Sequence, residues 1–449
     1  MARALEAVLG PDLPIAVRAY DGSRLGPADA LATLLVRSPV VFRRLITAPG
    51  ELGLGRAYVS GELDVEGDLF AALAALRDRM PDVRAFGPRQ WAEVLRLAGS
   101  SVLRTGLRAL PVPPEEARLG GVRHSRERDA AAIAHHYDVS NAFYRIVLGP
   151  SMTYSCAVWQ REDGTLEDAQ AAKYELVSRK LGLGPGMRLL DVGCGWGGMV
   201  LHAAANHGVG AVGVTLSRRQ AEWAEKAVAE AGLADRVEIR YQDYRDVLDG
   251  PFDAISSIGM FEHVGLSQLR VYFGGLRRLL RPGGRLLNHG IARPPNGGST
   301  RFQPKGFIDR YVFPDGELHE LGSVVSTMQG TGLEVRHVES LREHYALTLR
   351  AWVGNLENGW DEAVAEVGPG RARVWRLYMA ASALNFEAGR TQVHQVLAVR
   401  PDDGRSGLPL RSRFEEPPLR VDPVRGTVGR PGDEGGSCPH RSSSSATTS

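Results

Sequence analysis

Short apolar runs alternate with amphipathic helical patterns through the middle of the chain. The runs at 188–192, 211–216, 237–242, 252–258 and 284–291 have the length and branching of strands that are buried on both faces. Helical patterns separate them at 197–207, 217–231 and 266–280, and Ser217 is a suitable N-cap for the second. This alternation predicts an α/β fold on a largely parallel sheet.

Further elements flank this central part. After it, helices are expected near 321–329, 347–357 and 371–386, with strands at 333–338 and 391–400, and the last strand reversed completes a Rossmann-like, seven-stranded sheet. Before it, a strand at 14–20, a turn at Asp21-Gly22 and helices near 28–35 and 69–77 predict a smaller N-terminal α+β domain.

Breaks in regular structure divide the chain into three parts: 1–122, 123–400 and 401–449. Pro111-Val-Pro-Pro114 cannot continue a helix or a central strand, and Gly120-Gly121 adds another break. The last part is rich in Pro, Gly, Arg and Ser, so we expect a disordered tail.

Composition narrows the class of protein. Of the 449 residues, 43% are hydrophobic, which is enough for real cores, and a formal charge of +2 argues against a nucleic-acid partner. Three cysteines without a C-x-x-C pair fit a reducing compartment. Because no apolar run approaches about 20 residues, we expect no membrane span and a cytoplasmic location.

The most informative stretch is the glycine-rich turn after the first central strand, Gly193-Cys-Gly-Trp-Gly-Gly198. A strand, a glycine turn and a helix present backbone N–H groups to a nucleotide-like ligand. A dinucleotide site would have G-x-G-x-x-G spacing and an acidic residue about 20 residues later. Here the spacing is G-x-G-x-G-G and Asp191 lies inside the strand. The pattern favours the S-adenosylmethionine turn of a class I methyltransferase, with Asp191, Gly193 and Gly195 at the ligand, over a dinucleotide site or a plain strand–helix turn.

Two further strand ends supply candidate cofactor contacts. Many nucleotide-binding folds carry a ribose-binding acid after the second strand, but this chain has Thr215, Leu216, Ser217 and Gln220 there. Hydroxyl and amide groups can make the same hydrogen bonds. After the third strand, Asp243 is placed to face an adenine amine and Tyr244 to pack on the ring, unless Tyr244 is simply a surface aromatic residue.

A carboxylate and two histidines are expected at the same edge of the sheet. Glu262 and His263 follow the fourth strand in an apolar setting, and His289 ends the fifth. Ligands are reached at this edge of a doubly wound sheet, although Glu262 could instead stabilise a helix N-terminus and His289 could be a satisfied core residue. No H-x-x-x-H or H-E-x-x-H spacing links these residues, so we expect no metal.

Two segments before the central part have an unusual pattern. Residues 133–144 and 151–159 are rich in His, Tyr and Trp, and we interpret them as a helical lid over the cofactor rather than as plain core packing. Residues 91–107 predict an amphipathic helix with an arginine-bearing face, which packs on a core or contacts an anionic lipid surface.

Together these motifs resemble the cyclopropane-fatty-acyl-phospholipid synthase family, which includes mycolic acid cyclopropane synthases and relatives that install methylene or methyl branches. The matching segments are 134–144, 152–157, 189–197, 214–217, 261–265 and 343–352. The resemblance is dense over about 125–400 and looser over the N-terminal domain. The absence of the ribose-binding acid is itself typical of this family.

The resemblance implies methyl transfer from S-adenosylmethionine to the cis double bond of an unsaturated fatty acyl chain in a phospholipid. The resulting cation would lose a proton from the delivered methyl group to a bound bicarbonate ion and close a cyclopropane ring. The positions that match the family's bicarbonate site are Cys156, Glu262, His289, Tyr345 and the backbone at Ile291. Tyr154 and Ser155 match further cofactor contacts, and Tyr345 and Phe143 offer aromatic faces to the cation.

Other functions share many of these motifs. A methylene-forming enzyme of 10-methyl fatty acid synthesis would lose a different proton and would need a reductase partner. A methyltransferase for a non-lipid small molecule, or a fold relative that only binds, is also considered. The expected partners are phospholipid acyl chains, with no nucleic acid and, by analogy with the family, a homodimer. The expected location is the cytoplasm, peripheral at the inner membrane face.

Overall fold

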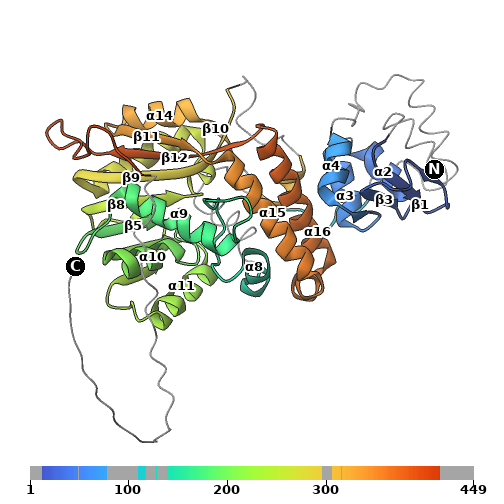
Figure 1. Ribbon diagram of the computed structural model, residues 1–449, viewed down its shortest axis with the longest axis horizontal. Coiled ribbons are helices and arrows are strands. Elements are labelled where there is room, and N and C mark those ends of the chain that lie inside the picture. The colour runs from blue at the N-terminus through green and yellow to red at the C-terminus, as the bar shows by residue number, and fades with distance from the viewer. Residues whose placement is uncertain are drawn as a thin grey trace, which may run out of the picture. The chain divides into compact units, whose positions relative to one another are not determined.

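Two sheets and their helices make up the described part of this computed structural model (Figure 1). It describes residues 13–48, 50–77, 110–117, 128, 139–295, 306–314 and 316–414. The predicted helix at 91–107, the start of the aromatic segment at 133–138 and residues 415–449 lie outside the described residues.

The larger sheet has the predicted seven-stranded arrangement. Its strands are β5 (Arg188–Val192), β6 (Gly210–Thr215), β7 (Val237–Tyr241), β8 (Phe252–Ile258), β9 (Leu280–Arg293), β11 (Glu334–Ser340) and β12 (Gln392–Val399). They lie in the order β11-β12-β9-β8-β5-β6-β7, and the short β10 (His319–Glu320) pairs with the end of β9. The last strand, β12, runs antiparallel to both β9 and β11, which confirms the reversed final strand.

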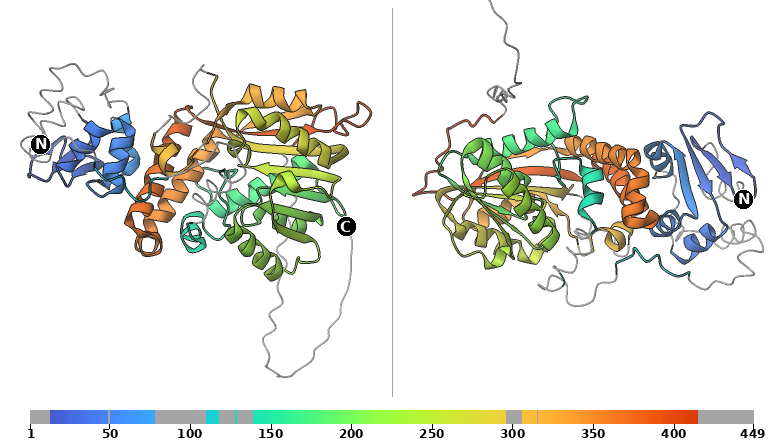
Figure 2. Two further views of the ribbon diagram at one scale, coloured as in Figure 1. Left: turned by 180° about the vertical axis from the view of Figure 1, so that it is seen from behind. Right: turned by 90° about the horizontal axis from the view of Figure 1, so that it is seen from below.

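Helices cover both faces of this sheet (Figures 1 and 2). On one face, α9 (Leu166–Leu181), α10 (Gly198–His207) and α11 (Arg218–Glu230) share a core with Leu189 and Leu287. On the other face, α12 (Leu269–Leu279) and α14 (Leu321–Gly330) share a core with Leu190 and Leu286. Neighbouring residues of one strand therefore belong to different cores, since side chains alternate across a strand. This two-sided burial explains the continuous apolar runs of the sequence.

A layer of helices packs beside the sheet. It consists of α8 (Asn141–Leu148), α13 (Phe307–Tyr311), α15 (Arg342–Asn358) and α16 (Trp360–Glu387), which is kinked at Gly368. The short helices η2 (Tyr244–Asp246), η3 (Phe261–His263) and η4 (Leu266–Gln268) follow sheet strands. α8, α15 and α16 share one aromatic core that contains Tyr144, Trp352 and Trp375. The described part of the predicted lid, α8 and residues 151–159, belongs to this layer.

The smaller sheet confirms the N-terminal α+β domain but corrects one element. Its strands are β1 (Ala16–Ala19), β2 (Arg24–Leu25), β3 (Ala32–Val36) and β4 (Leu63–Gly67), accompanied by α2 (Val40–Thr47), α3 (Glu51–Val59) and α4 (Leu69–Arg77). The helix predicted near 28–35 is wrong, because β3 occupies 32–36 between β1 and β4. This short apolar run has no clear period of its own, so its pairing with the neighbouring strands decides its conformation.

Side chains of α16 contact the small domain. Arg373 Nη2 lies 2.8 Å from Asp64 Oδ2 of β4, and Arg376 Nη1 donates to the Tyr58 hydroxyl at 3.0 Å. No helix in the described part of the chain is long and apolar enough to cross a membrane.

Ordered structure extends past residue 400, where the composition predicts the start of a disordered tail. Residues 401–414, which the sequence analysis assigns to the tail, contain a bridge between Asp402 and Arg405, and Phe414 is buried in the core under α9 and α10. Its ring packs against His337 at a centroid distance of 5.1 Å. Phe414 and the partly buried Leu408 therefore anchor a segment whose composition is otherwise typical of a tail.

Candidate active site

The glycine turn between β5 and α10 has the conformation that its sequence predicts. Gly193, Gly195 and Gly197 have φ values of 77°, 55° and 88°, which side chains rarely adopt. At Gly198, a Cβ atom would lie 2.1 Å from the Tyr174 hydroxyl. Gly198 therefore makes room for Tyr174, and the turn leads into the N-terminus of α10, where N–H groups are available to a ligand.

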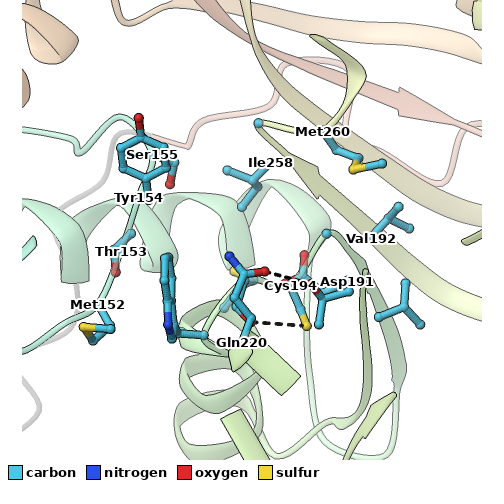
Figure 3. Close-up of a pocket in the computed structure, with 18 of the residues that line it drawn as sticks. Met152, Thr153, Tyr154, Ser155, Asp191, Val192, Cys194, Gln220, Ile258 and Met260 are labelled. Atoms are coloured by element: carbon cyan, nitrogen blue, oxygen red, sulfur yellow. Dashed lines mark hydrogen bonds between the residues drawn. The ribbon is translucent and has the colours of Figure 1, made fainter. Parts of the chain in front are cut away.

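A first cavity, with about 890 Å³ of empty space, opens at this turn (Figure 3). Part of that space is open to solvent. The predicted cofactor residues that line it are Tyr154, Ser155, Asp191, Gly193, Gly195, Thr215, Leu216, Gln220 and Tyr244. In Figure 3, Tyr154 and Ser155 lie on one side and Asp191 and Cys194 on another. The structure thus brings together residues from the lid, the turn and three strand ends.

A hydroxyl–amide pair occupies the position of the missing acidic residue. Thr215 Oγ1 donates to Gln220 Oε1 at 2.7 Å, and both residues line the first cavity. The bond orients the Gln220 amide, so the pair can serve the ribose hydroxyls or the methionine part of a cofactor.

Charged groups line the cavity beneath the lid. Asp191 accepts from Ser256 Oγ at 2.6 Å, and Lys173 Nζ donates to Ser155 Oγ at 3.1 Å. Burial raises the pKa of Asp191 and lowers that of Lys173, and the attraction between the two groups opposes both shifts. A carboxylate and an amine are thus available for a cofactor that carries both charge signs.

Two predicted cofactor residues do not line this cavity. Ser217 Oγ accepts from Gln220 N and caps α11, as the helix pattern predicts. Asp243 accepts hydrogen bonds from Nε and Nη2 of the Arg245 guanidinium. Their roles in cofactor binding remain predictions.

All five predicted catalytic residues line a second cavity, with about 560 Å³ of empty space. They are Cys156, Glu262, His289, Ile291 and Tyr345. The second cavity shares Tyr154, Ser155, Gly259 and His263 with the first. The two cavities therefore adjoin.

Glu262 is fixed at one oxygen only. It lies on η3 after β8, and its Oε1 accepts from Ile291 N at 2.7 Å. Its Oε2 is buried and has no hydrogen-bond partner among the described residues. Burial raises the pKa of Glu262 to about 7, against a smaller lowering by the Ile291 N–H. Such a carboxyl group is suited to exchange a proton near neutral pH.

His289 faces the same cavity from β9. Its Nδ1 lies 3.2 Å from Gln395 Nε2, whereas Nε2 is buried without a partner among the described residues. Burial, reinforced by nearby positive charge, lowers the pKa of His289 to about 3. The ring is therefore neutral at physiological pH.

Cys156 and Tyr345 complete the wall of the second cavity. The Cys156 thiol donates to Ala157 O at 3.2 Å, and burial holds its pKa well above the usual range. A buried, neutral thiol is a poor nucleophile. Phe143, by contrast, lines neither cavity and packs against Trp375, so the structure does not bring it to the site.

Sequence reasoning missed several residues at the two cavities, among them Lys173, Met260 and Phe313. His263, which was expected at this edge of the sheet, lines both cavities, and burial lowers its pKa to about 4. One signal for Lys173 was available, because Lys173 and Lys180 lie seven residues apart on the buried face of α9. Phe313 follows a segment without helical or strand periodicity, so no pattern could have placed it.

A third, mainly apolar cavity adjoins the second. It shares Ile291, Phe313, Leu318 and Tyr345 with the second cavity. Its other lining residues come mainly from α13, α15 and α16, and are Ile308, Leu349, Tyr378, Ser382, Asn385, Phe386 and Thr391. The three cavities adjoin one another, and the first has the largest share of polar lining while the second and third are mainly apolar.

A cluster of metal-ligand types lies elsewhere, between α9 and α10. Glu175 Oε2 is 3.4 Å from His202 Nε2 and 3.0 Å from His207 Nε2. These contacts, together with Asn206 Nδ2 at His202 Nδ1, form a hydrogen-bonded network. Among the described lining residues of the three cavities, none belongs to this cluster.

Comparisons with known proteins agree with this geometry. Residues 124–396 match the family model of mycolic acid cyclopropane synthetase. A probable fatty acid methyltransferase of Mycobacterium tuberculosis is 51% identical over 411 residues, 89% of this chain and 94% of the relative. The cyclopropane-fatty-acyl-phospholipid synthase of Escherichia coli strain K12 is 34% identical and covers 84% of this chain and 91% of its own length. A mycolic acid cyclopropane synthase solved with SAH and CTAB matches with a TM-score of 0.56 and 34% identity, covering 60% of this chain and 98% of that one.

Proposed function

This chain belongs to the mycolic acid cyclopropane synthetase family and is an S-adenosylmethionine-dependent fatty acid methyltransferase, and we propose that it converts the cis double bond of an unsaturated phospholipid acyl chain into a cyclopropane ring. The proposal places the cofactor in the first cavity, the double bond in the second and the acyl chain in the third.

One observation supports this arrangement above all. The buried acid Glu262 and the neutral histidine His289 line the second cavity, which shares residues with both the first cavity and the apolar third cavity. The third cavity is lined by Ile308, Leu349 and Phe386, among others. An alkyl chain gains free energy from such a lining, at roughly 0.8 kcal/mol per buried CH₂. CTAB, which carries a long alkyl chain, was bound to the related synthase.

The residues of the second cavity suit a cationic reaction. When bound, S-adenosylmethionine supplies an electrophilic methyl group, and the double bond that accepts it becomes a carbocation. The lid residues Tyr154 and Ser155 line this cavity, and exclusion of bulk water from it would keep the cation from being trapped as an alcohol. The aromatic rings of Tyr345 and Phe313 line the same cavity and can stabilise positive charge.

The same cavity fits a bicarbonate ion. Glu262 Oε2 can accept from the hydroxyl of such an ion, and an N–H at His289 Nε2 can donate to one of its oxygens; both atoms are buried and lack partners among the described residues. Bicarbonate bound there would supply a small base for the proton that the delivered methyl group loses. Glu262, His289 and Tyr345 would hold it, and the Ile291 N–H keeps the Glu262 carboxylate in place.

Product analysis tests this function. The chain is expressed in a bacterial host that makes unsaturated phospholipids but no cyclopropane fatty acids, with Glu262→Gln as the matched control. A cyclopropane ring and a methylene branch have the same mass, so fragmentation by chain position is combined with ozone treatment, which cleaves a methylene group and spares the ring. We expect an ozone-resistant product at the former double bond. An ozone-sensitive product would establish the methylene-forming alternative, and an unchanged acyl profile would point to a non-lipid substrate.

Replacement of Cys156 tests whether the thiol takes part in the chemistry. We expect Cys156→Ser to keep kcat within about tenfold of the native value, because a hydroxyl can replace the weak hydrogen bonds of the thiol. Turnover and S-adenosylmethionine affinity are measured together. Complete loss of turnover with native cofactor affinity would contradict a merely structural role.

A further inference from the structure

We propose that Lys180 and Gln395 are positioning residues that hold His289 as the tautomer with its proton on Nε2, and so give the second cavity a fixed hydrogen-bond donor for an anion. The identity of that anion as bicarbonate rests on the proposed function. The tautomer itself rests on the hydrogen-bond network alone.

The register of the sheet brings the two strand residues together. Gln395 of β12 lies directly opposite His289 of β9 in the antiparallel pair. Leu287 and Leu397, two residues away along each strand, belong to the core under α9. Because side chains alternate across a strand, His289 and Gln395 face the same side, where Lys180 in the last turn of α9 donates to Gln395.

The chemistry of lysine fixes the direction of every bond in this network. An ammonium group donates and cannot accept, so the Gln395 atom 2.7 Å from Lys180 Nζ is the amide oxygen. The amide nitrogen then faces His289 and lies 3.2 Å from Nδ1. Since an amide N–H₂ group only donates, Nδ1 accepts, and in a neutral ring the proton must reside on Nε2.

The consequence appears at the cavity. His289 Nε2 and Glu262 Oε2 are both buried without partners among the described residues, and both residues line the second cavity. With its proton on Nε2, the ring offers an anion a donor; with its proton on Nδ1, it would present a lone pair and repel the anion. The network thus decides whether the cavity attracts or repels negative charge.

Burial argues that the network has more than a packing role. Lys180 and Gln395 are fully buried, and Lys180 also forms an ion pair with Glu339. Replacing such a buried ion pair by apolar residues of similar volume is often neutral or stabilising. The neighbouring Val396 and Leu397 show that this strand accommodates apolar side chains. A requirement for a defined histidine tautomer accounts for the polar residues.

The tautomer can be read directly by NMR. The full chain is labelled with ¹⁵N-histidine, and the His289 signals are assigned by comparison with His289→Asn. Two-bond couplings from the ring carbon-bound protons then distinguish the tautomer with its proton on Nε2 from the tautomer with its proton on Nδ1. We expect the Nε2–H form in the native protein without cofactor or anion. A protonated Nδ1 in the native protein would overturn the proposal, whatever the enzyme makes.

Variants connect the tautomer with the reaction. Gln395→Met and Lys180→Met remove the amide or its anchor, and we expect kcat to fall by about 10- to 100-fold while S-adenosylmethionine affinity by calorimetry stays native. Gln395→Glu places an acceptor at Nδ1, and the NMR signature should show a proton there. Ser257→Ala, which removes a buried hydrogen bond between Ser257 of β8 and Tyr272 of α12, is the control and should leave both readouts unchanged.

The two proposals fail separately. Native NMR signals with the predicted tautomer but a non-cyclopropane product would overturn the proposed function and leave this inference intact. A cyclopropane product from a protein whose His289 carries its proton on Nδ1 would do the reverse. Native kcat in Gln395→Met, with a changed tautomer, would show that the tautomer does not control the reaction.

Discussion

Glu262→Gln should lower kcat by at least about 100-fold while leaving S-adenosylmethionine affinity near normal. The amide keeps the shape of the side chain and can still accept from Ile291 N, but it cannot take up negative charge or share a proton with a bound anion. Steady-state turnover on phospholipid vesicles and calorimetry with S-adenosylmethionine separate the two effects. A large loss of calorimetric affinity would place Glu262 in cofactor binding instead.

The same substitution should change stability in a pH-dependent way. Because burial raises the pKa of Glu262 from 4.5 to about 7, the folded protein holds this proton more tightly than the unfolded chain does. The free energy of unfolding contributed by this group therefore falls as pH rises from the unfolded to the folded pKa, by about 3 kcal/mol in all. Because the glutamine side chain does not ionise, the Glu262→Gln protein does not lose this free energy of unfolding as the pH rises.

Thermal unfolding at pH 5 and pH 8 measures the difference. We expect Glu262→Gln to match the native Tm more closely at pH 5 and to exceed it at pH 8. Glu230→Gln, on the exposed surface of α11, controls for the loss of a carboxylate in general. A pH-independent difference between Glu262→Gln and the native protein would mean that Glu262 is not desolvated.

Gly290→Ala should reduce both stability and turnover, because Phe261 packs directly on this glycine. A Cβ at Gly290 would lie 1.7 Å from Phe261 Cε1 and 2.2 Å from Cδ1. The ring is buried and must move, at a cost of about 1–3 kcal/mol. Since Phe261 precedes Glu262 on η3, its movement also shifts the carboxylate, and a displacement of about 1 Å can cost about 100-fold in rate.

Compensation distinguishes this account from general damage to the sheet. We expect Phe261→Leu in the Gly290→Ala background to restore part of the Tm and of kcat, because the smaller side chain leaves room for the new methyl group. Gly354→Ala, on α15 with open space around its Cβ position, is the matched control and should retain native turnover. If Gly290→Ala were as active as the native protein, the contact between Gly290 and Phe261 would not determine the geometry of the site.

Local pattern was sufficient for the central fold. The strands at 188–192 and 252–258 begin and end where predicted, and Ser217 caps α11. These predictions succeed because a strand that is buried on both faces needs a continuous run of apolar residues, and because glycine is favoured where φ is positive. The pattern was weak at two places. Pairing with β1 and β4 decided the conformation of β3, and burial of Phe414 and Leu408 against the core held the segment that follows β12.

The sequence by itself determined the alternating α/β fold, the glycine turn and the residue types that line the site, since each depends on short-range periodicity or on a matched motif. Only the tertiary structure decided which of those residues meet. The hydrogen bond from Lys180 to Gln395 joins residues 215 positions apart in the sequence, and that between Gln395 and His289 joins residues 106 positions apart. Likewise, Gly290 of β9 packs against Phe261 of η3. Strand order, register and helix packing set these contacts, and no local pattern encodes them.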